Sequence, residues 1–279
     1  MDEILYFCRL YKKTTHNNVA LIQSYEKSGS LLFKYRGQIP VIIFLITVPL
    51  LFFTNETLYL QLSAGHCQAL RVVMTILAML ISLAGLILRA YTVSTTPKGT
   101  SGRNTSKQVA DRLNTTGIYS VVRHPLYLAN YLIWAGMLVF TMNISIFLIV
   151  SLFYWVYYER IMFAEEAFLR KQFGEQFEMW AAKVPAFIPR FSLFKGGNLK
   201  FSFKTFVRRE YSTWFSAIFS YTIIDYLMYC AMARTSEGLS DACWLRPSLI
   251  VLAVSIVVVL VIKCLKHCTT LLQADSSRD

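Results

Sequence analysis

Six apolar stretches constrain this chain more than any other feature of its sequence. A helix needs roughly 20 mostly apolar residues to cross about 30 Å of membrane hydrocarbon. Stretches near that length recur along the 279 residues, and hydrophobic residues reach 55% while charged residues stay at 16%. The six stretches are 39–54, 70–92, 127–142, 144–163, 211–232 and 247–265. We therefore predict an all-α integral membrane protein with about six transmembrane helices.

The connections between these stretches differ in length and composition. Only Met142 and Asn143 separate the third stretch from the fourth, which predicts a tight helical hairpin. Residues 93–118 are polar and rich in turn-forming residues, and they form the long loop between the second and third spans. Residues 164–182 have the pattern of an amphipathic helix on the cytoplasmic surface, ended by two prolines.

The basic residues give the spans an orientation, because Lys and Arg are retained in cytoplasmic loops. With the N-terminus in the cytoplasm, 25 of the 28 Lys and Arg residues fall on the cytoplasmic side, and Arg71, Arg234 and Arg246 fall on the other. Both termini are therefore expected in the cytoplasm. The net charge of +12 then reflects topology and attraction to anionic lipid headgroups, and no recognisable motif supports nucleic-acid binding.

The same patterns divide the chain into three parts. Residues 1–38 form a basic segment with an apolar start, which suits a helix lying on the inner membrane surface. Residues 39–190 form a membrane core, and residues 191–279 add a basic loop and two C-terminal membrane helices. Asp225 lies inside the fifth apolar stretch with no partner visible in the sequence. An ionisable residue at that depth is a functional candidate by default.

The stretch TTGIYSVVRHPLYLANY, at residues 115–131, places charged side chains at the edge of an apolar run. Arg123 and His124 lie at the predicted cytoplasmic start of the third span. Pro125 falls in the first turn of that span, where proline is tolerated. The fourth span returns to the same side and delivers Glu165 and Glu166. We therefore expect the arginine, the histidine and the carboxylate pair to converge on the inner interface.

This order of residues resembles the isoprenylcysteine carboxyl methyltransferase family and its relatives, the phospholipid N-methyltransferases. The resemblance rests on a G-x-Y at 117–119, an R-H-P-x-Y at 123–127 and Gly136 in the third span. It continues with E-E-x-x-L, F-G and V-P between Glu165 and Pro189. The ordered series implies a membrane-embedded enzyme that transfers a methyl group from S-adenosylmethionine to a lipid or lipidated acceptor.

The resemblance also implies which residues form the site. Its cofactor-binding positions fall on Asn104, Asp111, Arg112, Leu113, Asn114, Gly117, Tyr119, Arg123, His124 and Glu165. Its catalytic positions, at the acceptor end, fall on Arg160 and Glu166. These residue types suit the cofactor, because guanidinium and imidazole N–H groups bind its carboxylate and a buried glutamate balances its ammonium and sulfonium charges. Tyr119 suits a place against the cation or the adenine ring.

Two classes of acceptor stay open. The eponymous substrate of the family is a prenylated cysteine with a terminal carboxylate. The loop TTPKGTSGRNTSKQ instead combines Lys98, Arg103 and Lys107 with glycines that leave backbone N–H groups accessible, which suits a phosphate or another anionic headgroup. The same composition also fits a solvated basic loop that charge alone keeps in the cytoplasm.

Plainer interpretations exist for several candidates and for the function itself. Arg123 fits a positive-inside anchor and Glu166 the solvated face of a surface helix. The alternative to an enzyme is a non-enzymatic membrane scaffold or carrier that kept the fold. A carrier is expected to show two matching halves, and the sequence shows no internal repeat. We predict no metal site, although Cys264, His267 and Cys268 share one helical face.

Overall fold

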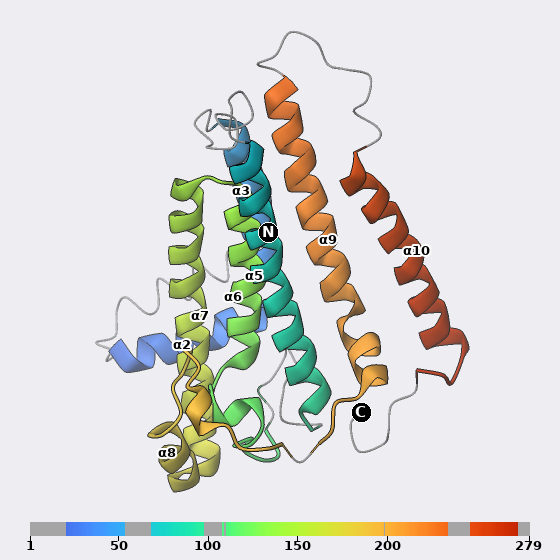
Figure 1. The fold of residues 1–279 in the computed structure, drawn as a ribbon. Coiled ribbons are helices and arrows are strands. Elements are labelled where there is room, and N and C mark those ends of the chain that lie inside the picture. Colours follow the sequence, from blue (N-terminus) through green and yellow to red (C-terminus); the bar gives the residue numbers. More distant parts are fainter. Residues whose placement is uncertain are drawn as a thin grey trace, which may run out of the picture.

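The computed structural model describes residues 21–53, 68–97, 108, 110–197, 199–233 and 246–272. Within these residues the chain forms eight α-helices and two short 3-10 turns, and no strand. The helices are α2 (Leu21–Lys34), α3 (Ile39–Phe53), α5 (Gln68–Thr95), α6 (Pro125–Phe140), α7 (Ile144–Phe173), α8 (Glu175–Ala181), α9 (Phe203–Ala233) and α10 (Pro247–Cys268). The long helices stand side by side and α2 lies across them (Figure 1). The predicted all-α class is confirmed for the described residues.

Three of the described helices are long and apolar enough to cross a membrane, namely Ala69–Thr95 within α5, α7 and α10. With 16 and 15 residues, α6 and α3 are shorter than a full span. Although α9 has 31 residues, its first turns carry basic and polar side chains. The count of six spans and the cytoplasmic orientation therefore stay predictions.

A short turn joins α6 to α7. Asn143 caps α7, where its side-chain oxygen accepts a hydrogen bond from Ile146 N at 3.0 Å. The predicted amphipathic helix at 164–182 is wrong at its start, because α7 runs unbroken to Phe173. The break comes at Gly174, whose φ of +49° is a conformation that favours glycine. That α6 and α7 cross a membrane as a hairpin stays a prediction.

Small residues let α5 and α6 approach backbone to backbone. A Cβ atom on Gly136 of α6 would lie 2.2 Å from Ser82 Oγ and 2.4 Å from Ala78 O of α5. A Cβ atom on Gly85 of α5 would lie 2.6 Å from Ala129 O of α6. Such close approach is typical of helices that pack in membranes, where small residues replace a hydrophobic driving force. This packing fixes the start of α6 relative to α5.

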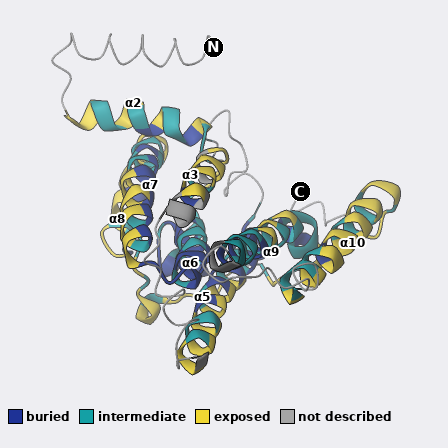
Figure 2. Ribbon diagram, turned by 90° about the horizontal axis from the view of Figure 1, so that it is seen from above, coloured by how far each residue is buried: buried dark blue, intermediate teal, exposed yellow. Residues whose placement is uncertain are grey.

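At one glycine, α2 crosses α7 and then leads through a turn into α3. A Cβ atom on Gly29 would lie 2.1 Å from Arg160 O, so only glycine fits at this crossing. Tyr157 OH of α7 donates a hydrogen bond to Leu32 O of α2 at 3.0 Å. Because the turn follows directly, Arg36 lies beside the second half of α7. Seen from above, α2 runs along one edge of the bundle (Figure 2).

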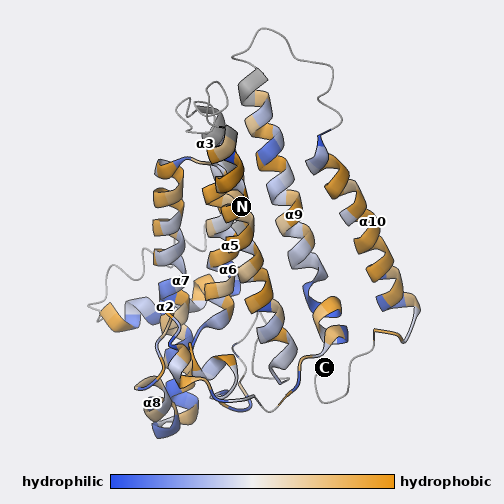
Figure 3. Ribbon diagram, viewed as in Figure 1, coloured by the Kyte–Doolittle hydropathy of each residue, from blue (hydrophilic) through white to orange (hydrophobic). Residues whose placement is uncertain are grey.

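The C-terminal helices α9 and α10 are joined by an ion pair. Asp225 of α9 accepts hydrogen bonds from Arg246 Nε at 3.0 Å, Arg246 Nη2 at 2.7 Å and Ser248 Oγ at 2.6 Å. The aspartate that has no visible partner in the sequence is therefore paired. Ser255 is the buried residue of α10, whose apolar side chains are otherwise partly or fully exposed. Figure 3 shows how hydrophobic this helix is along its length.

Candidate active site

Residues 117–124, which precede α6, carry one half of the candidate site. Gly117 has a φ of +61°, which favours glycine, and a 3-10 turn follows it at Ile118–Ser120. Arg123 N and His124 N donate hydrogen bonds to Pro185 O at 2.9 Å and to Ala186 O at 3.1 Å. The backbone beyond α8 therefore fixes the two charged residues at the start of α6.

The second half of α7 supplies two carboxylates to the same place. His124 Nε2 lies 2.9 Å from Glu166 Oε1, and His124 Nδ1 lies 3.5 Å from Glu165 Oε2. Arg123 Nε lies 3.0 Å from Glu166 Oε1. Tyr127 OH donates a hydrogen bond to Glu165 Oε1 at 2.8 Å. The structure thus brings together Arg123, His124, Glu165 and Glu166, which we name the carboxylate–histidine cluster.

The electrostatics of the carboxylate–histidine cluster favour a protonated histidine. Burial by itself lowers the pKa of His124, but the hydrogen bonds and negative charges of Glu165 and Glu166 outweigh it and raise the pKa above its ordinary value of about 6.5. A protonated imidazole donates from both ring nitrogens, which matches a carboxylate on each side. The cluster therefore balances cations against two carboxylates.

Tyr119 lies close enough to the carboxylate–histidine cluster to feel its charge. Burial of its hydroxyl and the negative charge of Glu165 raise the pKa of Tyr119, while a hydrogen bond with Thr96 acts in the opposite direction. The phenol therefore stays neutral. The same 3-10 turn anchors the segment to α8, because Trp180 Nε1 donates to Tyr119 O at 3.1 Å.

The segment upstream of Gly117 is less well connected. Asp111 and Arg112 are exposed, and Leu113 and Asn114 are half-buried. Buried polar atoms without a hydrogen-bond partner among the described residues include Ser94 Oγ, Gln108 Nε2 and Asn114 Nδ2. Asn104 lies outside the described residues, as do the loop cations Lys98, Arg103 and Lys107.

Arg160, which the resemblance places at the acceptor end, contacts α2. Its Nη1 atom donates to Ser28 Oγ at 3.2 Å, and its guanidinium lies 4.8 Å from the centre of the Tyr25 ring. Both partners belong to α2. Arg160 and Glu165 are five positions apart, which places the two on different faces of α7. A role for Arg160 at the acceptor end stays a prediction.

Sequence reasoning missed Arg36 as a neighbour of the carboxylate–histidine cluster. Arg36 Nη1 lies 3.4 Å from Glu165 Oε1, and its guanidinium lies 4.1 Å from the centre of the Phe33 ring. In the sequence it is one of several cations ahead of the first apolar stretch, and counting charge for topology does not separate it from the others. Its only local signal is its place at the end of that basic segment.

A buried ion pair lies at the same end of the bundle. Arg89 Nε of α5 donates to Glu210 Oε2 of α9 at 2.6 Å, and Arg89 Nη1 donates to Asn130 Oδ1 of α6 at 2.7 Å. The side chain of Glu210 is 1% exposed. This pair therefore joins three helices, two of which flank the site.

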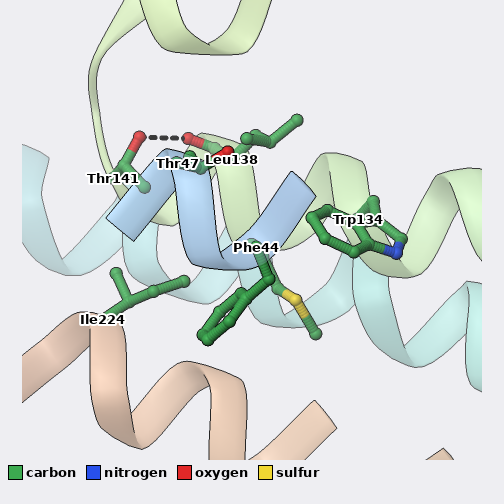
Figure 4. Close-up of a pocket in the computed structure, with 7 residues that line it drawn as sticks. Phe44, Thr47, Trp134, Leu138, Thr141 and Ile224 are labelled. Carbon is green, nitrogen blue, oxygen red and sulfur yellow. Dashed lines mark hydrogen bonds between the residues drawn. The ribbon is translucent and has the colours of Figure 1, made fainter. Parts of the chain in front are cut away.

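One small hollow in the bundle lies away from this chemistry (Figure 4). It is about the size of a water molecule and is lined by Phe44, Thr47, Trp134, Met137, Leu138, Thr141 and Ile224. The Thr141 hydroxyl bonds to Leu138 O at 2.7 Å, so the lining is effectively apolar. Trp134 follows His124 by ten residues, or about 15 Å along α6. The hollow is therefore separate from the carboxylate–histidine cluster.

Comparisons with known proteins concern the segment that carries this cluster. The family model for phospholipid methyltransferases matches residues 73–176. Over 95 residues the chain is 37% identical to the nickel-cobalt-cadmium resistance protein NccN of Alcaligenes xylosoxydans xylosoxydans, covering 34% of this chain and 42% of that protein. Over 96 residues it is 36% identical to the protein-S-isoprenylcysteine O-methyltransferase of Schizosaccharomyces pombe, covering 32% of this chain and 40% of that enzyme.

A third relative is the cobalt-zinc-cadmium resistance protein CzcN of Cupriavidus metallidurans, 37% identical over 84 residues, or 30% of this chain and 38% of that protein. The chain thus matches about two fifths of the length of these relatives. No solved structure matches. The resemblance to isoprenylcysteine and phospholipid methyltransferases is confirmed over the matched segment.

Proposed function

We propose, from the premise that residues 73–176 match the phospholipid methyltransferase family, that this chain transfers a methyl group from S-adenosylmethionine to a lipid or lipidated acceptor. The observation that carries the proposal is the carboxylate–histidine cluster. All four of its residues lie inside the matched segment, although more than 40 positions separate Arg123 from Glu165. The alternative is a scaffold or carrier that kept the fold. Such a protein gives no reason for the carboxylate–histidine cluster to be present.

The residues present fit the charged groups of S-adenosylmethionine. Its amino-acid end carries an ammonium and a carboxylate, which match Glu165 and Glu166 on one side and Arg123 and His124 on the other. Among the described residues, the buried amide of Asn114 has a free Nδ2 donor, which suits an acceptor atom of a bound molecule. We assign the adenosine end to this upstream segment, which contains Asn104, Asp111, Arg112, Leu113, Asn114, Gly117 and Tyr119.

Bound S-adenosylmethionine supplies a methyl group that its sulfonium already activates. The chain therefore contributes orientation and the exclusion of water. Tyr154 and Tyr158 are buried, and their rings stack with 4.2 Å between the centroids. The Tyr127 ring, 4.9 Å from that of Tyr158, joins them to Glu165. These tyrosines form a buried aromatic group beside the carboxylate–histidine cluster.

The acceptor we propose is an amphiphile that enters from the bilayer. A carboxylate, as in the isoprenylcysteine O-methyltransferase of fission yeast, is the first class, and a lipid phosphate or amine headgroup is the second. Cations on the α2 side of the cluster are suitable for an anionic acceptor, and Arg36 is the nearest, at 3.4 Å from Glu165. We keep Arg160 and Glu166 as the proposed residues of the acceptor end.

Cofactor binding tests the proposal directly. His124→Ala and Glu165→Gln should each weaken the binding of S-adenosylmethionine to the purified chain by about tenfold to a hundredfold, because a hydrogen bond to a charged group contributes roughly 1.5–3 kcal/mol. Calorimetry measures the affinity. Lys171→Gln, an exposed change near the end of α7, is the matched control and should bind as the wild type does. Unchanged affinity in both folded site variants would remove the cluster from the cofactor site.

A separate measurement identifies the acceptor. Lipids and lipidated proteins from cells with and without the gene are compared by mass spectrometry for species that differ by the mass of one methyl substitution. A methylated species that disappears with the gene and with His124→Ala gives the acceptor class. If every methylated species is still present in cells without the gene and in cells with His124→Ala, methyl transfer by this chain is contradicted.

A further inference from the structure

The connection between α8 and α9 combines exposed apolar side chains with exposed cations. Five large apolar residues along it and in the first turn of α9 are between 49% and 78% exposed: Ile188, Phe191, Phe194, Phe201 and Phe203. Four cations alternate with them and are exposed as well: Arg190, Lys195, Lys200 and Lys204. No Asp or Glu occurs between Glu178 and Glu210. We name residues 188–204 the aromatic–basic segment.

This combination of residues has a specific chemical match. Water-facing surfaces rarely hold several large apolar side chains together. Phenylalanine side chains enter the boundary between headgroups and acyl chains, while Lys and Arg remain with the headgroups above them. Since the segment carries cations and no carboxylate, its electrostatic complement is an anionic leaflet. In Figure 1 the segment runs along the end of the bundle where α5 ends and α9 begins.

The aromatic–basic segment is also bonded to the strip of backbone that carries the candidate site. Gly117 N donates to Lys195 O at 2.8 Å, and Lys195 N donates to Ser120 Oγ at 2.8 Å. Arg190 N donates to Val121 O at 3.0 Å. These bonds cover the same 117–124 stretch whose last two residues enter the carboxylate–histidine cluster. Movement of the segment therefore displaces the site.

We propose that the aromatic–basic segment is a binding surface for anionic phospholipid, and that lipid bound there holds residues 117–124 in place. The lipid contact does not depend on the proposed function, whereas its effect on cofactor affinity rests on it. In neutral lipid the cations of the segment lose their attraction to anionic headgroups, and the phenylalanines are held less firmly in the membrane. The segment and the 117–124 backbone then become more mobile.

Hydrogen–deuterium exchange of the full chain in nanodiscs tests the proposal. Discs of phosphatidylcholine are compared with discs of equal parts phosphatidylcholine and phosphatidylserine. We expect amide exchange in 188–204 and in 117–124 to slow by about tenfold or more in the anionic discs, since each cation near an anionic surface contributes roughly a fivefold factor. Lys200→Gln with Lys204→Gln removes two of the four cations and should reduce the difference by more than tenfold or to an undetectable level. Phe191→Ser with Phe194→Ser should also reduce the exchange difference between the two kinds of disc. This result would show that the apolar side chains contribute and that charge alone does not account for the effect.

The matched control removes the same charge elsewhere at this end of the bundle. Lys263→Gln with Lys266→Gln, in the last turns of α10, should leave the exchange difference as in the wild type. Equal exchange in both kinds of disc overturns the proposal. So does protection of 188–204 that is already complete in detergent, because another part of the chain then covers the segment. Calorimetry with S-adenosylmethionine in the same discs separates the two proposals: lipid-dependent exchange without any cofactor binding contradicts only the proposed function.

Discussion

The helix pair α5–α6 and the helix pair α9–α10 are joined in different ways. In the first pair, Gly85 and Gly136 bring the two backbones together along the middle of the helices. In the second pair, Asp225 and Arg246 join the helices at one end, and most of α10 has exposed apolar side chains. Further contacts join the second pair, since Thr222 Oγ1 donates to Ser248 O at 3.2 Å and Lys266 Nζ lies 5.6 Å from the centre of the Tyr211 ring. The first pair is therefore held by close backbone approach and the second by polar side chains. The first pair contains α6, at whose start the candidate site lies.

The Arg89–Glu210 ion pair connects these two regions, so breaking it should have the largest effect. Glu210→Ala leaves the Arg89 charge without its carboxylate between three helices. Removal of one partner of a buried pair costs about 3–5 kcal/mol. Thermal unfolding in detergent should show a large loss of stability. The double variant Arg89→Leu with Glu210→Leu should regain much of it, since no charge is then left buried. A Glu210→Ala protein as stable as the wild type would contradict the connection.

Asp225→Asn should have a smaller effect, confined to the C-terminal pair. It weakens a two-pronged bond between carboxylate and guanidinium, and we expect a loss of about 1.5–3 kcal/mol. Arg246→Lys keeps the charge but not the planar guanidinium group, so its stability should lie between that of the wild type and that of Asp225→Asn. The affinity for S-adenosylmethionine should be unchanged in both. A weaker cofactor affinity in folded Asp225→Asn would mean that α9 and α10 belong to the site.

The pH dependence of His124 should give the smallest effect, and it belongs to the α5–α6 region. Because the folded pKa of His124 lies above that of the unfolded chain, its protonation stabilises the fold. That stabilisation is complete below about pH 6.5 and is lost as the pH rises through the folded pKa. The melting temperature of the wild type relative to His124→Gln should therefore decrease with rising pH. A difference that is constant, or that grows with pH, would contradict a raised pKa.

The sequence predicts the core better than its surroundings, for physical reasons. Apolar stretches give the positions of α5, α6 and α7, because burial in lipid or in a bundle leaves a long hydrophobic signal. The proximity of His124 to Glu165 follows from a turn that reverses the chain between them. Neither signal locates Arg36 or Glu210, since Arg36 lies in the turn between α2 and α3 and Glu210 lies in α9, and neither contact with the core leaves a periodic pattern.

Polar contacts between distant segments are the part that sequence reasoning cannot reach. Asp225 has its partner 21 positions away, across residues 234–245, which lie outside the described residues. The sequence also gives no sign that Arg160 contacts α2, where Gly29 lets the two helices meet and the Arg160 guanidinium donates to Ser28 Oγ. This contact depends on how closely α2 and α7 approach each other. Gly29 permits the approach, and it lies in a segment whose composition indicates only that it is basic.

The 16 residues of α6 give it a length of about 24 Å, less than the roughly 30 Å of a hydrocarbon layer. On the predicted topology, with α6 crossing the membrane and its far end at one surface, His124 at its start would lie about 6 Å inside the other. The proposed acceptor, dissolved in the bilayer, would then meet the proposed site without leaving the lipid phase. The concentration that matters is then the mole fraction of acceptor in the membrane. Added inert lipid lowers this mole fraction, whereas added water does not.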